Sequence, residues 1–330
     1  MSGTWNGKRV LVTGAGGFIA SHLVESLVRN GATVRAFVRY NSRSDVGLLN
    51  QVPKEIYSGI QVIAGDLRDL TAIQNAAKGM ETIFHLGALI AIPYSYQHPA
   101  EVVDTNVIGT LNILLAARDM QIRVIHTSTS EVYGSAIYAP IDEAHPLQGQ
   151  SPYSASKIAA DKLAESFYCS YDLPVVTVRP FNTYGPRQSA RAIIPTIISQ
   201  ALTGSELHLG SLDTKRDFTY VLDTVAGFLA AAESTGVDGQ TFNLGTGREI
   251  SVGELVTVIE KIVGRPLTVV QDPERLRPQK SEVVRLLSDN RKAQKQLNWK
   301  PETTLESGLA QTVTWIQSNL QFYRPGIYQR

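Results

Sequence analysis

The stretch Arg9-Val10-Leu11-Val12-Thr13-Gly14-Ala15-Gly16-Gly17-Phe18-Ile19 decides the fold of this 330-residue chain. Its β-rich start predicts a short buried strand, and the apolar pattern that continues to Val28 and stops at Gly31 predicts a helix. Glycines between a strand and a helix let the backbone approach a pyrophosphate, which the positive amino end of the helix attracts. We therefore predict a dinucleotide site that includes Gly14, Gly16, Gly17, Phe18 and Ile19.

Three more β-rich runs follow, at Thr33–Val38, Gln61–Leu67 and Thr82–Ala88, and helical stretches separate them. This alternation predicts an α/β fold of the Rossmann type, a doubly wound parallel sheet with right-handed connections. The alternation breaks down after Asn182, where we expect a smaller mixed α/β substrate-binding lobe. The predicted dinucleotide-binding domain covers residues 1–181 and a returning segment at about 219–246, and the lobe covers residues 182–218 and 247–330.

The end of the second strand bears on the choice of cofactor. It carries Arg39, with Arg43 nearby, and lacks the acidic residue that would bind the ribose hydroxyls of NAD. An arginine can pair with the 2′-phosphate of NADP, so we favour NADP over NAD, and the alternative is that both arginines are solvated. Asp66 is placed to accept a hydrogen bond from the adenine amino group. The other residues expected beside the cofactor are Leu67, Leu86 and Ala88.

A second informative stretch runs from Ile122 to Lys157. An apolar run ends in Thr127-Ser128-Thr129-Ser130-Glu131, which is typical of a buried strand that opens into a site. If that end stays extended, Thr129 and Glu131 point to the same face. Tyr153 and Lys157 are one helical turn apart, and an ammonium beside a phenol lowers the pKa of the phenol. The alternatives are a chance Tyr–Lys pair and a solvated polar turn.

Composition excludes several other classes. The net charge of +1 gives no field for nucleic acid or an acidic membrane, and no run approaches the roughly 18 apolar residues that span a bilayer. The single cysteine, Cys169, cannot form an internal disulfide, which suits a reducing cytoplasm. The amino terminus lacks the apolar core of a signal peptide, and no Cys/His cluster has metal-ligand spacing. We expect a cytoplasmic protein without a metal site.

Taken in order, these motifs resemble the extended short-chain dehydrogenase/reductase family, the nucleotide-sugar epimerases and dehydratases. The resemblance implies that Thr129, Tyr153 and Lys157 form the catalytic triad, that Asn106 supports the active-site helix, and that the cofactor is tightly retained. It also implies a homodimer through two long helices, around Pro99 to Met120 and Tyr153 to Tyr171, whose apolar faces would otherwise pack within one chain. The motifs are Thr13-Gly14-x-x-Gly17-Phe18-Ile19, Asp66-Leu67, His85-Leu86-Gly87-Ala88, Asn106-Val107-x-Gly109-Thr110, Ser128–Gly134, Tyr153-x-x-x-Lys157, Arg179–Pro186 and Arg216-Asp217-Phe218.

Within the family, the Thr-Ser-Glu sequence at 129–131 and Arg216-Asp217-Phe218 resemble a nucleotide-sugar 4,6-dehydratase. Segments 88–96, 148–153 and 185–191 resemble LegB-like dehydratases of legionaminic acid biosynthesis, which implies GDP- or UDP-N-acetylglucosamine as the substrate. Glu131 is the expected base at sugar carbon 5, and Glu131 or Ser130 assists loss of the 6-hydroxyl. The expected ligands of the sugar diphosphate are Asn182, Arg187, Arg191, Arg216 and Arg277.

Three alternatives remain open at this level. Two are enzymes on the same scaffold: a nucleotide-sugar 4-epimerase, or a decarboxylase of the UDP-glucuronate type. The third is a non-catalytic NADP-binding regulator, although the intact Thr129, Tyr153 and Lys157 argue against it. The mass of the product separates the two enzymes from a dehydratase.

Overall fold

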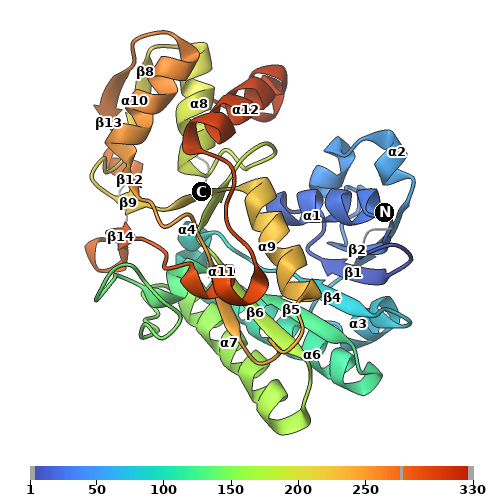
Figure 1. Cartoon of the computed structure of the whole chain (residues 1–330). Coiled ribbons are helices and arrows are strands. Elements are labelled where there is room, and N and C mark those ends of the chain that lie inside the picture. The colour runs from blue at the N-terminus through green and yellow to red at the C-terminus, as the bar shows by residue number, and fades with distance from the viewer. Residues whose placement is uncertain (1–3, 276–277, 326–330) are drawn as a thin grey trace.

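A seven-stranded parallel sheet forms the centre of the computed structural model, which describes residues 4–275 and 278–325 (Figure 1). The strand order is β11-β6-β5-β4-β1-β2-β3, and every neighbouring pair is parallel. The order reverses between β1 and β4, which is where doubly wound sheets bind ligands. The predicted Rossmann-type fold is confirmed. The strands are β1 (Arg9–Thr13), β2 (Thr33–Arg39), β3 (Ile60–Gly65), β4 (Thr82–His85), β5 (Arg123–Thr127), β6 (Val175–Pro180) and β11 (Thr241–Leu244).

Helices cover both faces of the sheet because alternate strand residues point in opposite directions. In β1, Val10 and Val12 pack with α1 and α9 on one face of the sheet. Leu11 packs with α3, α6 and α7 on the other face. Figure 1 shows α6 and α7 below the sheet and α1 and α9 above it. The helices that accompany the sheet are α1 (Phe18–Arg29), α2 (Lys54–Tyr57), α3 (Leu70–Ala77), α4 (Ile92–Gln97), α5 (Pro99–Val103), α6 (Gly109–Met120), α7 (Pro152–Tyr171), α9 (Val221–Glu233) and α11 (Arg291–Leu297).

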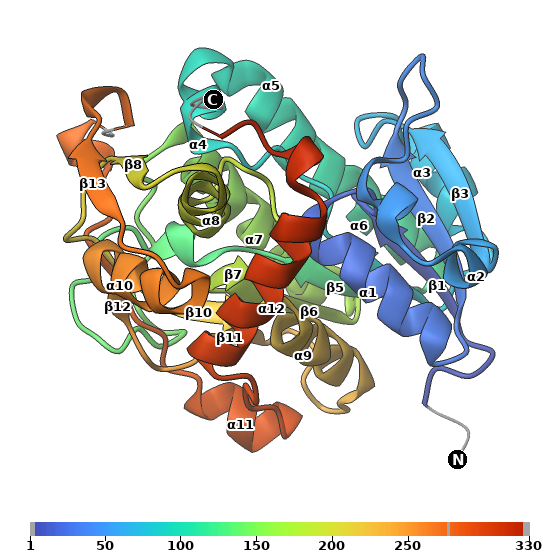
Figure 2. The same ribbon diagram turned by 90° about the horizontal axis from the view of Figure 1, so that it is seen from above.

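A smaller lobe follows the sixth strand and has its own apolar core, built around Ile197, Leu255 and Ile316. Figure 2 shows α8 and α10 of this lobe at the opposite end of the molecule from β1, β2 and β3. The lobe contains short strand pairs and one three-stranded sheet, β12-β9-β14. Its elements are β7 (Asn182–Tyr184), α8 (Ile193–Thr203), β8 (Glu206–Leu209), β9 (Lys215–Arg216), β10 (Phe218–Tyr220), β12 (Ile250–Ser251), α10 (Val252–Val263), β13 (Thr268–Gln271), β14 (Arg285–Leu286) and α12 (Leu305–Ser318).

The stretch Pro99–Met120 is a continuous helix in which a π-helical turn, Asp104–Ile108, separates α5 from α6. By length and composition alone this helix would be able to cross a membrane. Half of its most apolar window is buried inside the protein, and the core helix of a soluble protein passes the same test. The helix therefore gives only weak support for a membrane span.

Candidate active site

The glycine-rich loop between β1 and α1 packs so closely on neighbouring backbone that side chains on it would clash. Gly14 has a φ of +66°, and a Cβ there would lie 2.6 Å from the Cα of Gly87 on the neighbouring strand end. A Cβ on Gly16 would lie 2.6 Å from the carbonyl oxygen of Val46. Gly17 is the N-cap of α1, followed directly by Phe18 and Ile19. The tightly packed loop leads into the amino end of α1, whose partial positive charge attracts a pyrophosphate.

A cavity of about 120 Å³ lies beside this loop, at the carboxyl ends of β1, β2 and β3. Arg68, which sequence reasoning passed over, pairs with Asp66 at 2.6 Å and holds the pKa of that carboxyl at about 2. The Arg39 guanidinium lies 3.3 Å from Glu101 of α5. Leu86 packs at the edge of the sheet core. The lining residues are Gly14, Phe37, Arg39, Gly65, Asp66, Leu67, Arg68, Gly87, Ala88, Leu89 and Thr105.

Asn106, in the π-helical turn, is buried, and its side chain makes hydrogen bonds with two separate segments of the chain. Its amide oxygen accepts from the Leu89 N–H at 2.8 Å, and its amide nitrogen donates to the Leu89 carbonyl oxygen and to the Ser156 hydroxyl. Ser156 lies in α7 between Tyr153 and Lys157. Asn106 therefore joins the segment after β4 to the helix that carries the Tyr–Lys pair.

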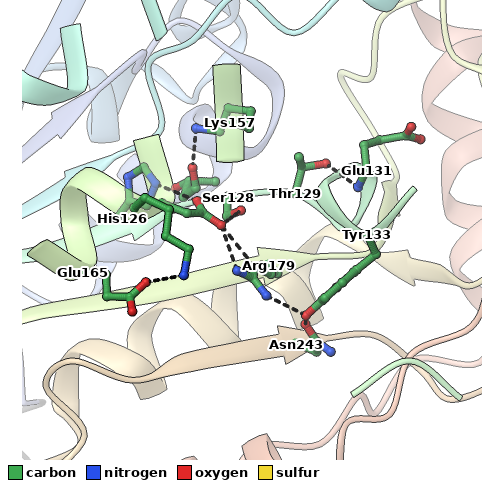
Figure 3. Close-up of polar contacts among 12 residues, drawn as sticks. His126, Ser128, Thr129, Glu131, Tyr133, Lys157, Glu165, Arg179 and Asn243 are labelled. Carbon is green, nitrogen blue, oxygen red and sulfur yellow. Dashed lines mark hydrogen bonds and ion pairs between the residues drawn. The ribbon is translucent and has the colours of Figure 1, made fainter. Parts of the chain in front are cut away.

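The end of β5 differs from the extended geometry considered above. The strand stops at Thr127, and Ser130–Tyr133 form a 3₁₀ turn that Thr129 caps by accepting the Glu131 N–H at 3.3 Å. The idea that Thr129 and Glu131 share a strand face is therefore wrong, because a hydroxyl that can bond the backbone two residues on favours a turn over a strand. Figure 3 shows the Glu131 carboxylate pointing away from Lys157.

Tyr153 and Lys157 lie in the first two turns of α7. A capping box between Ser151 and Ser154, with Pro152 in the first turn, starts this helix. Both side chains are buried, and the Lys157 ammonium donates to the carbonyl oxygen of Thr127 at 2.6 Å (Figure 3). Burial lowers the pKa of Lys157 to about 8.

The pKa of the Tyr153 phenol is raised in this structure, so the net shift is opposite to the lowering expected beside a lysine. Burial raises the pKa of Tyr153, and the charges of Glu131 and Asp161 raise it further, whereas a hydrogen bond with the Thr129 hydroxyl lowers it. The ammonium is directed to the backbone of β5 instead. Formation of the phenolate at this site therefore requires positive charge beyond that of Lys157.

Sequence reasoning missed a buried ion pair between Asp161, on the same face of α7, and Arg179 of β6. The Asp161 carboxylate accepts from Arg179 at 3.0 and 3.2 Å, from the Ser128 hydroxyl at 2.7 Å and from the His126 ring at 3.1 Å. The available signal was the spacing, because Asp161 follows Lys157 by the same four residues that separate Lys157 from Tyr153. Its charge partner Arg179, in contrast, lies on β6, so sequence spacing does not reveal the pair.

The predicted diphosphate ligands occupy different environments. Asn182 begins β7, and within the described residues its buried amide oxygen has no hydrogen-bond partner. Arg216 is buried and pairs with Glu282 at 3.2 Å, whereas Arg191 is exposed. Arg187 is buried against α1, where it pairs with Glu25 at 2.6 Å, so the structure does not bring it to the other candidates. Arg277 lies outside the described residues.

The segment around Ser281 ties the lobe to the part of the chain that carries the Tyr–Lys pair. The Ser281 hydroxyl donates to the carbonyl oxygen of Gln150 at 2.8 Å and lies 2.6 Å from the hydroxyl oxygen of Tyr96. Gln150 directly precedes the N-cap of α7. The smaller lobe and the helix that carries the Tyr–Lys pair are thereby held together at this point.

The residues present fit a bound nicotinamide dinucleotide. The glycine loop leads into the amino end of α1, a cavity lies beside Asp66 at the carboxyl ends of β1, β2 and β3, and the Tyr–Lys pair lies near the carboxyl end of β5. A Rossmann sheet with these residues defines an extended short-chain dehydrogenase/reductase. The chain belongs to the GDP-mannose 4,6-dehydratase family, whose model matches residues 11–312.

Proteins similar to this chain catalyse different reactions on nucleotide sugars. A UDP-glucose 4-epimerase from Mycolicibacterium smegmatis is 35% identical over 95% of this chain and 100% of its own length. A UDP-N-acetyl-alpha-D-glucosaminuronate decarboxylase from Bacillus cytotoxicus is 31% identical over 94% of this chain and 98% of its own. The crystal structure of a dTDP-glucose 4,6-dehydratase double mutant from Streptomyces venezuelae, with NAD bound, has a TM-score of 0.84 at 28% identity and covers 96% and 98% of the two chains. The family is one of NAD(P)-dependent enzymes that modify nucleotide sugars.

Proposed function

We propose that this protein is a nucleotide-sugar 4,6-dehydratase that converts GDP- or UDP-N-acetylglucosamine to the 4-keto-6-deoxy sugar. The observation that carries the proposal is the position of Glu131, on the 3₁₀ turn that follows β5 and that Thr129 caps. A dehydratase needs a base at carbon 5 in addition to the group that acts at carbon 4. Epimerisation at carbon 4 needs no such carboxylate.

The chain's own residues divide the work as follows. Tyr153, as phenolate, takes the proton of the 4-hydroxyl, and Lys157 and Thr129 stabilise and orient it. A nicotinamide held by the glycine loop, Tyr153 and Lys157 would supply the hydride acceptor for carbon 4 and the hydride donor for carbon 6. Glu131 removes the proton that the ketone has acidified at carbon 5, and Glu131 or Ser130 supplies the proton with which the 6-hydroxyl leaves as water. A solvent proton finally adds to carbon 5, so the reaction is redox-neutral and suits a retained cofactor.

Further parts of the proposal concern the surroundings of the site. The lobe of residues 182–218 and 247–330 binds the sugar diphosphate, with Asn182, Arg216 and Arg277 as the better candidate ligands. Arg39 favours NADP over NAD. The resemblance of segments 88–96, 148–153 and 185–191 to LegB-like dehydratases supports a cytoplasmic role in legionaminic acid biosynthesis.

A homodimer through α5, α6 and α7 is also proposed. The side chains of Val103, Ile108 and Tyr171 are 43%, 41% and 51% exposed on these helices. Apolar side chains exposed along adjacent helices are typical of a surface that another chain covers.

The test is mass spectrometry of the purified protein incubated in D₂O separately with GDP- and UDP-N-acetylglucosamine, first without added cofactor and then with NADP or NAD. In H₂O a dehydratase product is lighter than the substrate by one water, about 18 mass units, and in D₂O it keeps one solvent deuteron at carbon 5. An unchanged mass supports the 4-epimerase, to which the Mycolicibacterium smegmatis relative belongs. Loss of carbon dioxide from a glucuronate substrate supports the decarboxylase.

Glu131→Gln separates the steps. We expect it to retain oxidation at carbon 4, seen as near-ultraviolet absorbance of reduced cofactor, while loss of water falls by at least about 100-fold. Glu165→Gln, an exposed carboxylate of α7, is the matched control and should behave as the wild type. Unaltered loss of water in Glu131→Gln would remove the dehydratase assignment of this residue.

A further inference from the structure

The Asp161–Arg179 ion pair is a costly feature that the proposed reaction does not use directly. Both side chains are almost fully buried, at 5% exposure each. Replacing a buried ion pair by apolar residues is often neutral or stabilising, so burial of a charge calls for a reason other than stability. The geometry around Asp161 supplies one.

Three side chains on one face of α7 hold three successive residues at the end of β5. Tyr153, Lys157 and Asp161 are spaced four residues apart, so they lie above one another on the helix. The Tyr153 phenol faces the Thr129 hydroxyl, the Lys157 ammonium donates to the Thr127 carbonyl oxygen at 2.6 Å, and the Asp161 carboxylate accepts from the Ser128 hydroxyl at 2.7 Å. The Ser128 N–H is itself fixed to the Val178 carbonyl oxygen at 2.7 Å.

The Asp161 carboxylate is in turn clamped from the side of β6. Arg179 donates to Asp161 and, through its other terminal nitrogen, to the Tyr133 hydroxyl at 2.9 Å. Tyr133 donates to the Asn243 amide oxygen at 2.7 Å, which links the network to β11 (Figure 3). The carboxylate is thus held by groups from β5 and β6 and has little freedom to turn away.

We propose that Asp161 is a positioning residue for the reaction, which holds the strand end that carries Thr129 and keeps the Lys157 ammonium charged. The inference rests on the proposed function only in assuming that the Tyr–Lys site performs the chemistry. Asp161 itself contacts neither the phenol nor any reacting atom. Its effect passes through Ser128 and Lys157.

The electrostatic part of the proposal follows from the charges around Lys157. Burial lowers the pKa of this lysine to about 8, and Asp161 is the charge that opposes the shift. The other ionisable groups that face the cluster are His85 from β4, His126 from β5, Arg179 from β6, Tyr153 from α7, and Glu131 and Tyr133 from the 3₁₀ turn. Burial lowers the pKa of both histidines, so they stay neutral, and the His126 ring nitrogen facing the carboxylate carries the proton.

The test compares Asp161→Asn with Asp238→Asn in the full-length protein. Asp238 pairs with Arg123 at the opposite ends of the strands, so its replacement removes an equal charge far from the site. One readout is kcat and KM as a function of pH. The other readout needs no substrate and is an NMR titration that follows the ¹³Cε resonances of the lysines. The resonance of Lys157 is identified as the one that is missing from the spectrum of Lys157→Arg.

For Asp161→Asn we expect kcat to fall by about 10- to 100-fold with little change in KM, since displacement of a catalytic group by 1 Å costs this much. We expect the Lys157 midpoint to fall by about one pH unit, because a nearby negative charge has been removed. Both limbs of the pH profile then move to lower pH, since the Asp161 charge also raises the pKa of Tyr153. A purely structural residue would lower the profile without moving it.

Because Asp161→Asn leaves Arg179 buried without its partner, Asp161→Asn/Arg179→Gln serves as a second variant that removes both charges. An unshifted Lys157 midpoint, or a kcat equal to that of Asp238→Asn, would overturn the proposal. If the wild type turns over no nucleotide sugar, the proposed function fails, and the NMR titration still decides the role of Asp161.

Discussion

The Lys157 ammonium donates a 2.6 Å hydrogen bond to the carbonyl oxygen of Thr127, the last residue of β5. This contact joins the catalytic helix to the central strand at the edge of the sheet where the ligands of Rossmann folds bind. It also removes the lysine from water, and burial disfavours its charged form. The charge of the site therefore changes within an accessible pH range.

The first prediction concerns this pH range. Below a pKa of about 8 Lys157 is protonated, and above it the site loses this cation. If the positive charge of the bound oxidised cofactor brings the pKa of Tyr153 below that of Lys157, kcat falls as pH rises through about 8. A pH–rate profile measures this limb. Lys162→Gln, an exposed lysine of α7, should leave the limb in place. An alkaline limb near the ordinary lysine value would show that Lys157 does not set it.

Tyr153→Phe removes only the hydroxyl that takes the substrate proton. We expect kcat to fall by at least about 1,000-fold while the fold and cofactor affinity persist, since general base catalysis contributes roughly two to four orders of magnitude. Mass spectrometry of the product measures the loss of turnover, and circular dichroism checks that the fold persists. Tyr138→Phe, which removes an exposed hydroxyl bonded to Asp142, is the control. A wild type that binds NADP tightly without turnover would instead favour the regulator.

Arg39→Asp tests the cofactor preference. Arg39 lines the cavity beside Asp66 and is two-thirds exposed as a side chain, so it is accessible to a 2′-phosphate. Hydrogen bonds to a charged group contribute about 1.5–3 kcal/mol, so we expect NADP affinity to fall by about 10- to 100-fold while NAD affinity is maintained or rises. Isothermal titration calorimetry of the apoprotein with each dinucleotide measures both. Equal losses for the two cofactors would refute the assignment.

Arg187→Ala distinguishes a structural arginine from a substrate ligand. Its guanidinium pairs with Glu25 in a largely buried contact between the lobe and α1. Glu25 keeps its pair with Arg29 at 2.8 Å when Arg187 is removed, so we expect the loss of one charged hydrogen bond, about 2 kcal/mol in the free energy of unfolding. Urea unfolding measures this loss, and the KM for the nucleotide sugar should be unchanged. The opposite pattern, full stability with a raised KM, would place Arg187 at the diphosphate.

Ile108→Asp tests the dimer. A carboxylate in a buried apolar interface carries a large desolvation cost, so we expect the variant to run as a monomer. Size-exclusion chromatography with light scattering gives the mass. Leu222→Asp, an equally exposed apolar residue on α9, should keep the wild-type mass. Identical masses for the wild type and both variants would exclude this surface.

Local pattern was enough to predict the Rossmann sheet. The strand Arg9–Thr13 and the helix that ends at Tyr171 follow from hydrophobic runs bounded by glycines or a cap, and these signals lie within a few residues of each other. The 3₁₀ turn after Thr129 was not predicted, since a side-chain cap competes with the strand only when tertiary contacts place it.

The candidate site was predictable where the motif is local and not where it depends on distant partners. The positions of Tyr153 and Lys157 follow from one helical turn, but the direction of the ammonium depends on Thr127, thirty residues earlier. Arg187 is similar, because its partner Glu25 is 162 positions away. Net pKa shifts depend on such burial and cannot be derived from spacing alone.

The π-helical turn Asp104–Ile108 has a consequence for how this helix tolerates change. A π turn amounts to one residue more than a regular α-helix would use, and each residue turns an α-helix by about 100°. Deleting a single residue here would restore a regular helix and rotate everything beyond it by that angle. Asn106 and the outward-facing Ile108 would then leave their positions together. The extra residue thus sets the rotation of the helix about its axis. The inward position of Asn106 at the candidate site and the outward position of Ile108 on the apolar surface both depend on it.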